Sequence, residues 1–260
     1  MSWRVVARRD VDVLRADRSF LLFPGFFGLL AAAMAYAFTR GPASTPLSSG
    51  LALLFLFAVP LTAGTVTHEA IPSAVSSGRI RLALSLPHSR PAFLAGTGVA
   101  RLAVTVAGIA TAVATGLVVF AVRGGVIAPV EVAAVVALSA LLGAAFVAAT
   151  LALTAGSAST TLATASTYAF FVLSLFWPIV ANVAAALAES ELGFDLAPST
   201  VDALVLGSPL FAYGNALGVA GIQTVSTSGQ SSPWFGVVVL AAWTGLGFAL
   251  AAVRFGRVDL

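Results

Sequence analysis

Six long apolar runs constrain this chain more than any other feature of its sequence. A run of about 20 apolar residues crosses the roughly 30 Å hydrocarbon core of a bilayer as a helix. With 59% apolar and only 9% charged residues, the chain could not cover a surface that faces water. We therefore predict an all-α membrane protein with six transmembrane helices, near Phe20–Thr39, Leu51–Ile71, Val99–Val122, Val130–Leu153, Thr167–Ala188 and Trp234–Val253.

Arginine is distributed unequally between the two ends of these runs. The amino-terminal segment, the second connection and the tail hold all but two of the thirteen basic residues, and only Arg40 and Arg123 fall on the other side. Basic residues near membrane spans are retained in the cytoplasm. Because an even number of spans brings both ends of the chain to one side, the pattern predicts that both termini are cytoplasmic.

The segment before the first run has the pattern of an amphipathic helix. Over residues 1–18 the apolar side chains, Trp3 and Leu14 among them, share one face, and Arg4, Arg8 and Arg15 form a stripe beside it. Such a helix lies in the headgroup region with its apolar face toward the bilayer. The alternative is a frayed basic leader that only sets the topology.

The largest connection, residues 189–233, carries four acidic residues and no arginine, as expected of an outer loop. Ser199 or Thr200 predicts the start of one short helix, and Ser208-Pro209 predicts a second. These pieces either lie against or partly within the outer leaflet, or form an ordinary capped surface loop.

Two features within the fifth run concern packing. Trp177-Pro178 predicts a kink, because proline removes one backbone hydrogen bond from a helix. Asn182 is the most polar side chain deep in a span, and we expect it to bond a neighbouring helix.

Catalysis by the chain alone is not supported by its residues. The absence of lysine excludes a P-loop, and the absence of cysteine excludes thiolate metal ligands and disulfides. His68-Glu69 lacks the second histidine of a zincin motif, because Pro72 stands in its place. Charged residues lie near the ends of the runs and not at their centres, where a proton-coupled transporter would need them. We expect no catalytic residue, no cofactor and no metal.

The connection between the second and third runs is the distinctive part of the sequence. It reads Ser77-Gly78-Arg79-Ile80-Arg81-Leu82-Ala83-Leu84-Ser85-Leu86-Pro87-His88-Ser89-Arg90, followed by Gly96. This stretch closely resembles the first cytoplasmic loop of ABC-2 type permeases, the membrane subunits of one group of ATP-binding-cassette exporters. The basic amino end, the six spans and the tail Arg254–Leu260 are similar to the same family.

The resemblance implies a role for this loop. In the family a short helix docks in a groove of a separate ATPase subunit and transmits its closure. The residues that would couple the chain to the ATPase are Arg79, Arg81, Leu82, Leu84, Leu86, Pro87, Ser89 and Arg90. Ser89 is suited to cap the following helix, with Pro91 in its first turn. The alternative is a basic loop that only fixes the topology.

We therefore expect one transmembrane permease domain over residues 1–260, with an interfacial helix at 1–18, a coupling loop at 72–98 and an outer loop at 189–233. Its expected function is the membrane subunit of an ATP-driven exporter, whereas a passive scaffold that recruits a cytoplasmic partner is the alternative. The expected partners are an ABC ATPase dimer, a second permease copy and membrane lipids, and not nucleic acid. The expected location is the cell membrane, as a multi-pass protein.

Overall fold

A computed structural model describes residues 3–40, 45–80, 89–222 and 231–257, and the regular structure in these ranges is helical. Six of the helices are long and apolar enough to cross a membrane, which confirms the predicted six-helix membrane fold. The helices, with one short 3-10 turn, are α1 (Trp3–Ala16), α2 (Ser19–Phe38), α3 (Leu47–Thr67), α4 (Pro72–Ser76), α6 (Arg90–Val122), α7 (Pro129–Thr154), α8 (Thr160–Leu192), α9 (Pro198–Val205), α10 (Pro209–Ala216), η1 (Leu217–Ala220) and α11 (Pro233–Gly256).

The helices α6 and α8 extend well beyond the apolar runs that predicted them. They begin at Arg90 and Thr160, whereas the runs begin at Val99 and Thr167. In both cases a serine supplies the start, because the Ser89 and Ser159 side chains accept hydrogen bonds from backbone N–H groups of the first turn. Hydrophobicity marks the part of a helix that lies in lipid, whereas capping marks where the helix begins.

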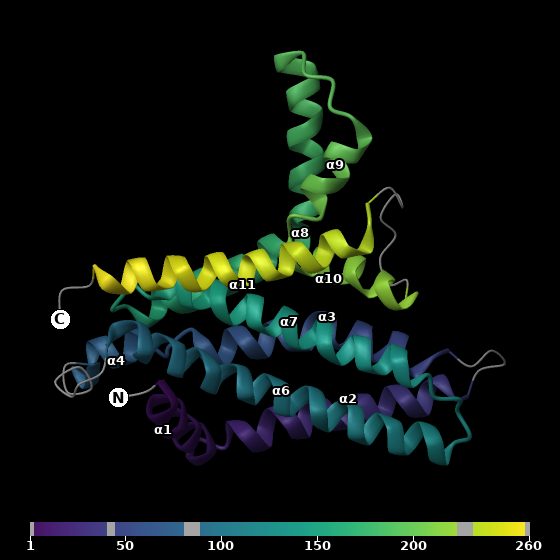
Figure 1. The fold of residues 1–260 in the computed structure, drawn as a ribbon, viewed down its shortest axis with the longest axis horizontal. Helices are drawn as coiled ribbons and strands as arrows, with labels where there is room; N and C mark the ends of the chain where they lie inside the picture. The colour runs from purple at the N-terminus through teal and green to yellow at the C-terminus, as the bar shows by residue number, and fades with distance from the viewer. Residues whose placement is uncertain (1–2, 41–44, 81–88, 223–230, 258–260) are drawn as a thin grey trace.

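Five helices, α2, α3, α6, α7 and α11, run side by side along the long axis of the molecule (Figure 1). Small residues let them approach closely. A Cβ on Gly108 of α6 would lie 3.3 Å from the Phe27 ring of α2, and one on Gly247 of α11 would lie 2.9 Å from Ala148 of α7. Lipid is as apolar as leucine, so close packing of this kind, and not burial from water, holds membrane helices together.

The helix α7 forms the centre of the bundle. From Leu142 to Leu151 its side chains are almost all buried, and it contacts α3, α6, α10 and α11. In contrast, one face of α2 is open, with Leu21 72% exposed. A leucine on the outside of a membrane bundle faces acyl chains, so this surface needs no partner.

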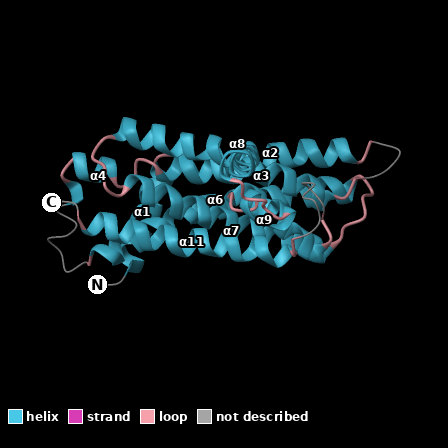
Figure 2. Cartoon of the chain, turned by 90° about the horizontal axis from the view of Figure 1, so that it is seen from above, coloured by secondary structure: helices cyan, strands magenta, loops and turns pink. Residues whose placement is uncertain are grey.

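The helix α8 is the least buried of the six, with 11% of its most apolar window inside the protein. Its first part packs beside α3 and α7, where Phe170 and Phe171 contact the Phe146 ring. Its carboxyl-terminal part turns away from the bundle with α9 beside it, and is seen end-on in Figure 2. We refer to residues 182–205 as the arm.

The connection after α8 returns to the bundle as a broken element. The helix α9 and the α10–η1 unit meet at an angle of 108° across a break at Leu206, Gly207 and Ser208. Seven of the eight residues of α10 are buried, among them Tyr213 at 0% exposure. This part of the predicted outer loop is therefore embedded between helices and is not a surface loop.

The two ends of the bundle differ in their charged groups. At one end Arg40 and Arg123 both stack over the Tyr36 ring, 4.4 and 4.9 Å from its centre. At the opposite end lie α1, α4, the start of α6 and the end of α11 (Figure 1). The two groups of arginines predicted for opposite membrane faces thus lie at opposite ends. Which face is cytoplasmic stays a prediction from arginine asymmetry.

Candidate coupling site at the α1 end of the bundle

The predicted coupling residues that the structure describes all lie at the α1 end. Arg79 follows α4, and its exposed guanidinium donates to the Ser77 and Ser73 hydroxyls at 3.0 and 3.3 Å. Ile80 beside it is buried, at 1% exposure. Ser89 caps α6 by accepting from the Ala92 N–H at 3.3 Å, as predicted. The other predicted residues, Arg81, Leu82, Leu84, Leu86 and Pro87, lie outside the described residues.

Arg90 joins the coupling loop to the last helix of the chain. Its guanidinium donates to the carbonyl oxygens of Phe255 and Gly256 at 2.9 and 2.7 Å. These carbonyls lie at the end of α11, where regular helical donors run out, so a cation there supplies a donor and complements the helix dipole. The rings of Phe93 and Phe255 stack 5.9 Å apart beside this contact. The start of α6 and the end of α11 therefore form one unit.

The helix α1 is fixed to α6 by a close approach at Gly96. A Cβ there would lie 2.6 Å from the Val6 Cβ and 2.7 Å from the Trp3 carbonyl oxygen, so no larger residue fits without moving α1. The buried side chains of α1, Val6, Ala7 and Leu14, face the protein. Instead of lying free on the membrane with its apolar face down, the predicted interfacial helix uses that face to dock on its own bundle.

Between α1 and the first turns of the bundle lies a polar cavity of about 490 Å³. Six charged side chains line it, three basic and three acidic: Arg9, Arg79, Arg101, Asp10, Asp17 and Glu69. The Arg101 side chain is 13% exposed and lies 3.9 Å from Asp10, and its Nε is buried without a hydrogen-bond partner. A buried guanidinium has five donors to satisfy, and a single distant carboxylate satisfies few of them.

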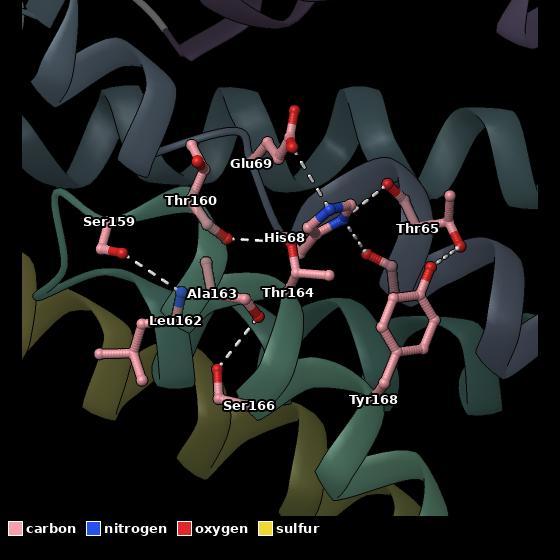
Figure 3. A network of polar contacts seen from close by, with 11 residues as sticks. Thr65, His68, Glu69, Ser159, Thr160, Leu162, Ala163, Thr164, Ser166 and Tyr168 are labelled. Carbon is pink, nitrogen blue, oxygen red and sulfur yellow. Dashed lines mark hydrogen bonds and ion pairs between the residues drawn. The ribbon is translucent and has the colours of Figure 1, made fainter.

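A second polar network joins the end of α3 to the start of α8 (Figure 3). The His68 Nδ1–H donates to the Thr65 carbonyl at 2.9 Å, and its Nε2 lies 3.6 Å from Glu69. The Thr65 hydroxyl and the Tyr168 hydroxyl are 3.0 Å apart. Because a carbonyl can only accept, the proton is placed on Nδ1.

The His68 Nδ1–H is therefore already used in a hydrogen bond to the backbone of its own helix. Among the described residues no cluster of three metal-ligating side chains occurs, so His68-Glu69 stands without the further ligands that a zinc site needs.

Away from this end, three hydrogen bonds converge on the break between α9 and α10. The Trp177 indole N–H donates to the Leu204 carbonyl at 2.7 Å, and the Trp243 indole N–H donates to the Gly207 carbonyl at 2.8 Å. The buried Ser208 hydroxyl donates to the Ser174 carbonyl at 2.8 Å. Irregular backbone within a membrane is tolerated only where protein satisfies its polar groups, and these bonds do so.

A comparison with known protein families matches residues 5–260 to the family described as ABC-2 family transporter protein. The chain belongs to the ABC-2 transporter family. The match covers the six spans together with α1 and the embedded α10, so this is a permease component of an ABC transporter and a multi-pass membrane protein. Association with an ABC ATPase component is implied by the family. No curated protein matches the chain.

Two local interpretations of the permease sequence need correction. Asn182 donates to the Pro178 carbonyl of its own helix at 2.7 Å, and not to a neighbouring helix. The helix α9 begins at Pro198 after Ala197, so neither Ser199 nor Thr200 caps it. The predicted helix start at Ser208-Pro209 is confirmed, since Ser208 occupies the cap position of α10, although its hydroxyl bonds α8 and not its own helix.

Neither the two tryptophan contacts nor the bonding of Arg90 was predicted from the sequence of this permease. A proline inside a span signals that the carbonyl group four residues earlier needs an outside donor, and Ser208 supplies it. The partner of Trp243 carries no such signal, because only the fold brings α11 to Gly207.

Proposed function

We propose that this permease is the transmembrane subunit of an ATP-driven exporter, with ATP hydrolysed by a separate ATPase dimer at the α1 end. The family match over residues 5–260 is the observation that carries the proposal. The chain contains no lysine for a P-loop, so hydrolysis by that route must come from another subunit. This assignment makes the α1 end cytoplasmic and places the protein in the cell membrane.

The arrangement at the α1 end supports its use as the docking surface. Arg79, Ser89 and Arg90 lie there together with α1. The leucines of the same loop would supply the apolar contact that the family resemblance implies. The proposed roles divide the domain into three parts. The amino-terminal helix at residues 1–18 supports α6, the loop at residues 72–98 couples the permease to the ATPase, and the loop at residues 189–233 shapes the exit for the cargo.

The contacts of α11 supply a physical route from this surface to the break. Arg90 and Phe93 hold the end of α11, and Trp243 in the same helix bonds the Gly207 carbonyl. A helix is stiff over this length, so a shift of the coupling loop moves the Trp243 indole N–H, which donates to the Gly207 carbonyl at the break. The element with two arrangements would be the break itself, whose three hydrogen bonds can be made or lost.

The cargo that fits the spans best is amphipathic or lipid-like. Their interiors offer apolar groups with a few hydroxyls, and the chain contains only two methionines and no cysteine. Soft metal ions would need a chain of sulfur ligands that this composition does not provide.

A second copy of the permease completes the proposed assembly. The exposed face of the arm carries apolar side chains, among them Val183 and Leu187, at 53% and 54% exposure. The arm leaves its own bundle, so its support has to come from elsewhere. Pairing through α8 would give twelve transmembrane helices around a shared path.

Co-purification with its ATPase in mild detergent tests the proposal. We expect a stable complex whose ATP hydrolysis changes with cargo, and we expect Leu84→Asp with Leu86→Asp to abolish both, because new charges would have to be desolvated at an apolar surface. Val126→Asp, at an exposed position at the other end, is the matched control and should retain both. A complex that forms without any change in hydrolysis would instead favour the passive scaffold.

A further inference from the structure

We propose that the cavity at the α1 end is a binding site for the headgroup of an aminophospholipid, with a phosphate held by arginine and a primary ammonium held by carboxylates. The inference concerns the resting permease and does not depend on coupling to an ATPase. Three observations support it: the charges that line the cavity, its position relative to the spans, and the unsatisfied Nε of Arg101.

The charges of the cavity match a zwitterion better than a simple ion. Three arginines and three carboxylates line one space of about 490 Å³. Asp10 is already paired with Arg101 at 3.9 Å, whereas Asp17 and Glu69, whose neighbour at 3.6 Å is the His68 ring, can receive a cation. A purely anionic ligand would face these carboxylates, and a purely cationic one would face the arginines. Phosphate next to ammonium meets both kinds of group.

Arg101 provides the strongest pointer to a phosphate. Its side chain is 13% exposed, and its Nε is buried with no hydrogen-bond partner in the protein. A buried charged donor that has no acceptor is costly, so a ligand that supplies one is favoured. Phosphate oxygens suit a guanidinium, since its planar donors bind them two at a time.

The depth of the cavity places it at the level of lipid headgroups. Arg101 is followed by the apolar stretch 102–122 of α6, which is about 31 Å long at a rise of about 1.5 Å per residue. Asp17 precedes α2, and Glu69 follows α3, both of which have nearly the same length. All three groups therefore flank the same end of spans that match the roughly 30 Å hydrocarbon core.

The neighbouring surface is suited to the rest of a lipid. Phe23 and Val66, from within α2 and α3, line the cavity on the side of the spans, whereas the charged groups come mainly from α1 and the α3 and α6 ends. An acyl glycerol backbone can thus continue along the helices into the bilayer. This favours a lipid over a free phosphate compound, which would leave the apolar lining unused.

The test measures lipids retained by the purified permease, with no ATPase present. The protein is extracted from nanodiscs that contain phosphatidylethanolamine, phosphatidylcholine and phosphatidylglycerol in equal amounts, and retained lipids are counted by native mass spectrometry. We expect about tenfold preferential retention of phosphatidylethanolamine, equivalent to one added charge-assisted contact of about 1.4 kcal/mol. Equal retention of the three lipids would overturn the proposal.

Two variants separate the halves of the site. Asp17→Asn with Glu69→Gln changes only exposed side chains, so the fold should survive, and the preference for phosphatidylethanolamine over phosphatidylcholine should disappear. Arg101→Gln should lower retention of every phospholipid at this site. Arg123→Gln, at the opposite end, is the control and should change nothing. An unaltered preference in the double carboxylate variant would refute the assignment.

Two further outcomes would assign the cavity elsewhere. Displacement of the bound lipid by soluble phosphoethanolamine would show a site for the free compound, and the lipid assignment would fall. If the variants leave lipid retention unchanged but weaken co-purification of the ATPase, the cavity receives a segment of that partner, and the lipid proposal is wrong.

Discussion

Pro178 removes one backbone N–H from α8, and the carbonyl group left without its helical partner is that of Ser174, four residues earlier. The Ser208 hydroxyl replaces that donor at 2.8 Å from another part of the chain. This hydrogen bond ties α8 at its proline to the break between α9 and α10. Without the Ser208 hydroxyl, the Ser174 carbonyl would be buried and unpaired.

Replacing this serine gives the first prediction. Ser208→Ala should destabilise the permease by about 1–2 kcal/mol, because the Ser174 carbonyl loses its donor. In a Pro178→Ala background, where the helix recovers its own N–H, the same substitution should cost clearly less. Unfolding by increasing mole fraction of sodium dodecyl sulfate measures both values. Equal costs in the two backgrounds would show that Ser208 acts through something other than this carbonyl.

Arg90 illustrates a residue whose partner lies far away in the sequence, at the end of α11. Arg90→Gln should release the last turn of α11, because two carbonyl oxygens lose a charged donor. We expect the backbone amide hydrogens of this last turn to exchange about fivefold faster, which corresponds to a loss of about 1 kcal/mol in the free energy of local opening. Arg257→Gln adjoins the same turn and should leave exchange unchanged. Hydrogen exchange followed by mass spectrometry gives both rates.

At the scale of elements, α11 is held at several points along its length. Asn215 Oδ1 accepts from the Gly236 N–H at 3.1 Å near one end, Trp243 bonds the break, and Gly247 lies against the backbone of α7. Arg254 donates to the carbonyl oxygen of Ala152, in the last turn of α7. The helix is therefore clamped to α10 and α7 as a unit.

Two glycines in α11 test this packing as a matched pair. Gly247→Ala places a Cβ 2.9 Å from Ala148, so α7 and α11 must separate, at a cost of about 1–3 kcal/mol. Gly245→Ala, two residues away, meets nothing within 4 Å and should be neutral or stabilising by up to about 1 kcal/mol. Thermal unfolding in detergent distinguishes the two. Similar unfolding midpoints for both variants would mean that α7 and α11 accommodate the added methyl group without loss of stability.

At the scale of the whole molecule, the arm is the feature that the single chain does not explain. It leaves the bundle between its two ends (Figure 2) and carries Glu189 and Glu191 near its tip. A carboxylate in the hydrocarbon core costs roughly 3 kcal/mol. A second copy packed along the arm, or a rotation of the arm toward the headgroups, removes that cost.

Cross-linking tests the second copy directly, because the chain has no native cysteine. Single cysteines at Val183 and Leu187 on the arm should give dimers in membranes with a short bis-maleimide. A cysteine at Val118, an exposed position of α6 with 63% exposure, should give none. Dimers formed equally from all three positions would indicate random collision and would count against pairing through the arm.

Cysteine labelling tests the orientation. A cysteine at Val126, at the end opposite α1, should react with a membrane-impermeant maleimide applied to intact cells, and one at Ser76 in α4 should react only after the cells are opened. Reaction of Ser76→Cys alone in intact cells would invert the topology and place the coupling loop outside.

The sequence was most informative where one residue or one run fixes the outcome. Six apolar runs predicted six spanning helices, and Ser89 predicted the start of α6. It was least informative where a polar group chooses among several acceptors. Asn182 bonds its own helix, the cap position of α9 is Ala197 and not Ser199, and the Ser208 hydroxyl bonds α8. The coupling leucines lie outside the described residues, so their contacts stay predictions.

Apolar run length and arginine placement by themselves determined the class of protein, the number of spans and an expected orientation, because transfer into lipid is governed by composition over about 20 residues. Only the tertiary structure decided that α10 is embedded, that Arg90 caps α11, and that six charges surround one cavity beneath α1. Each of these depends on contacts between segments far apart in the chain. A local sequence pattern cannot predict these contacts, because they form only when the helices pack together.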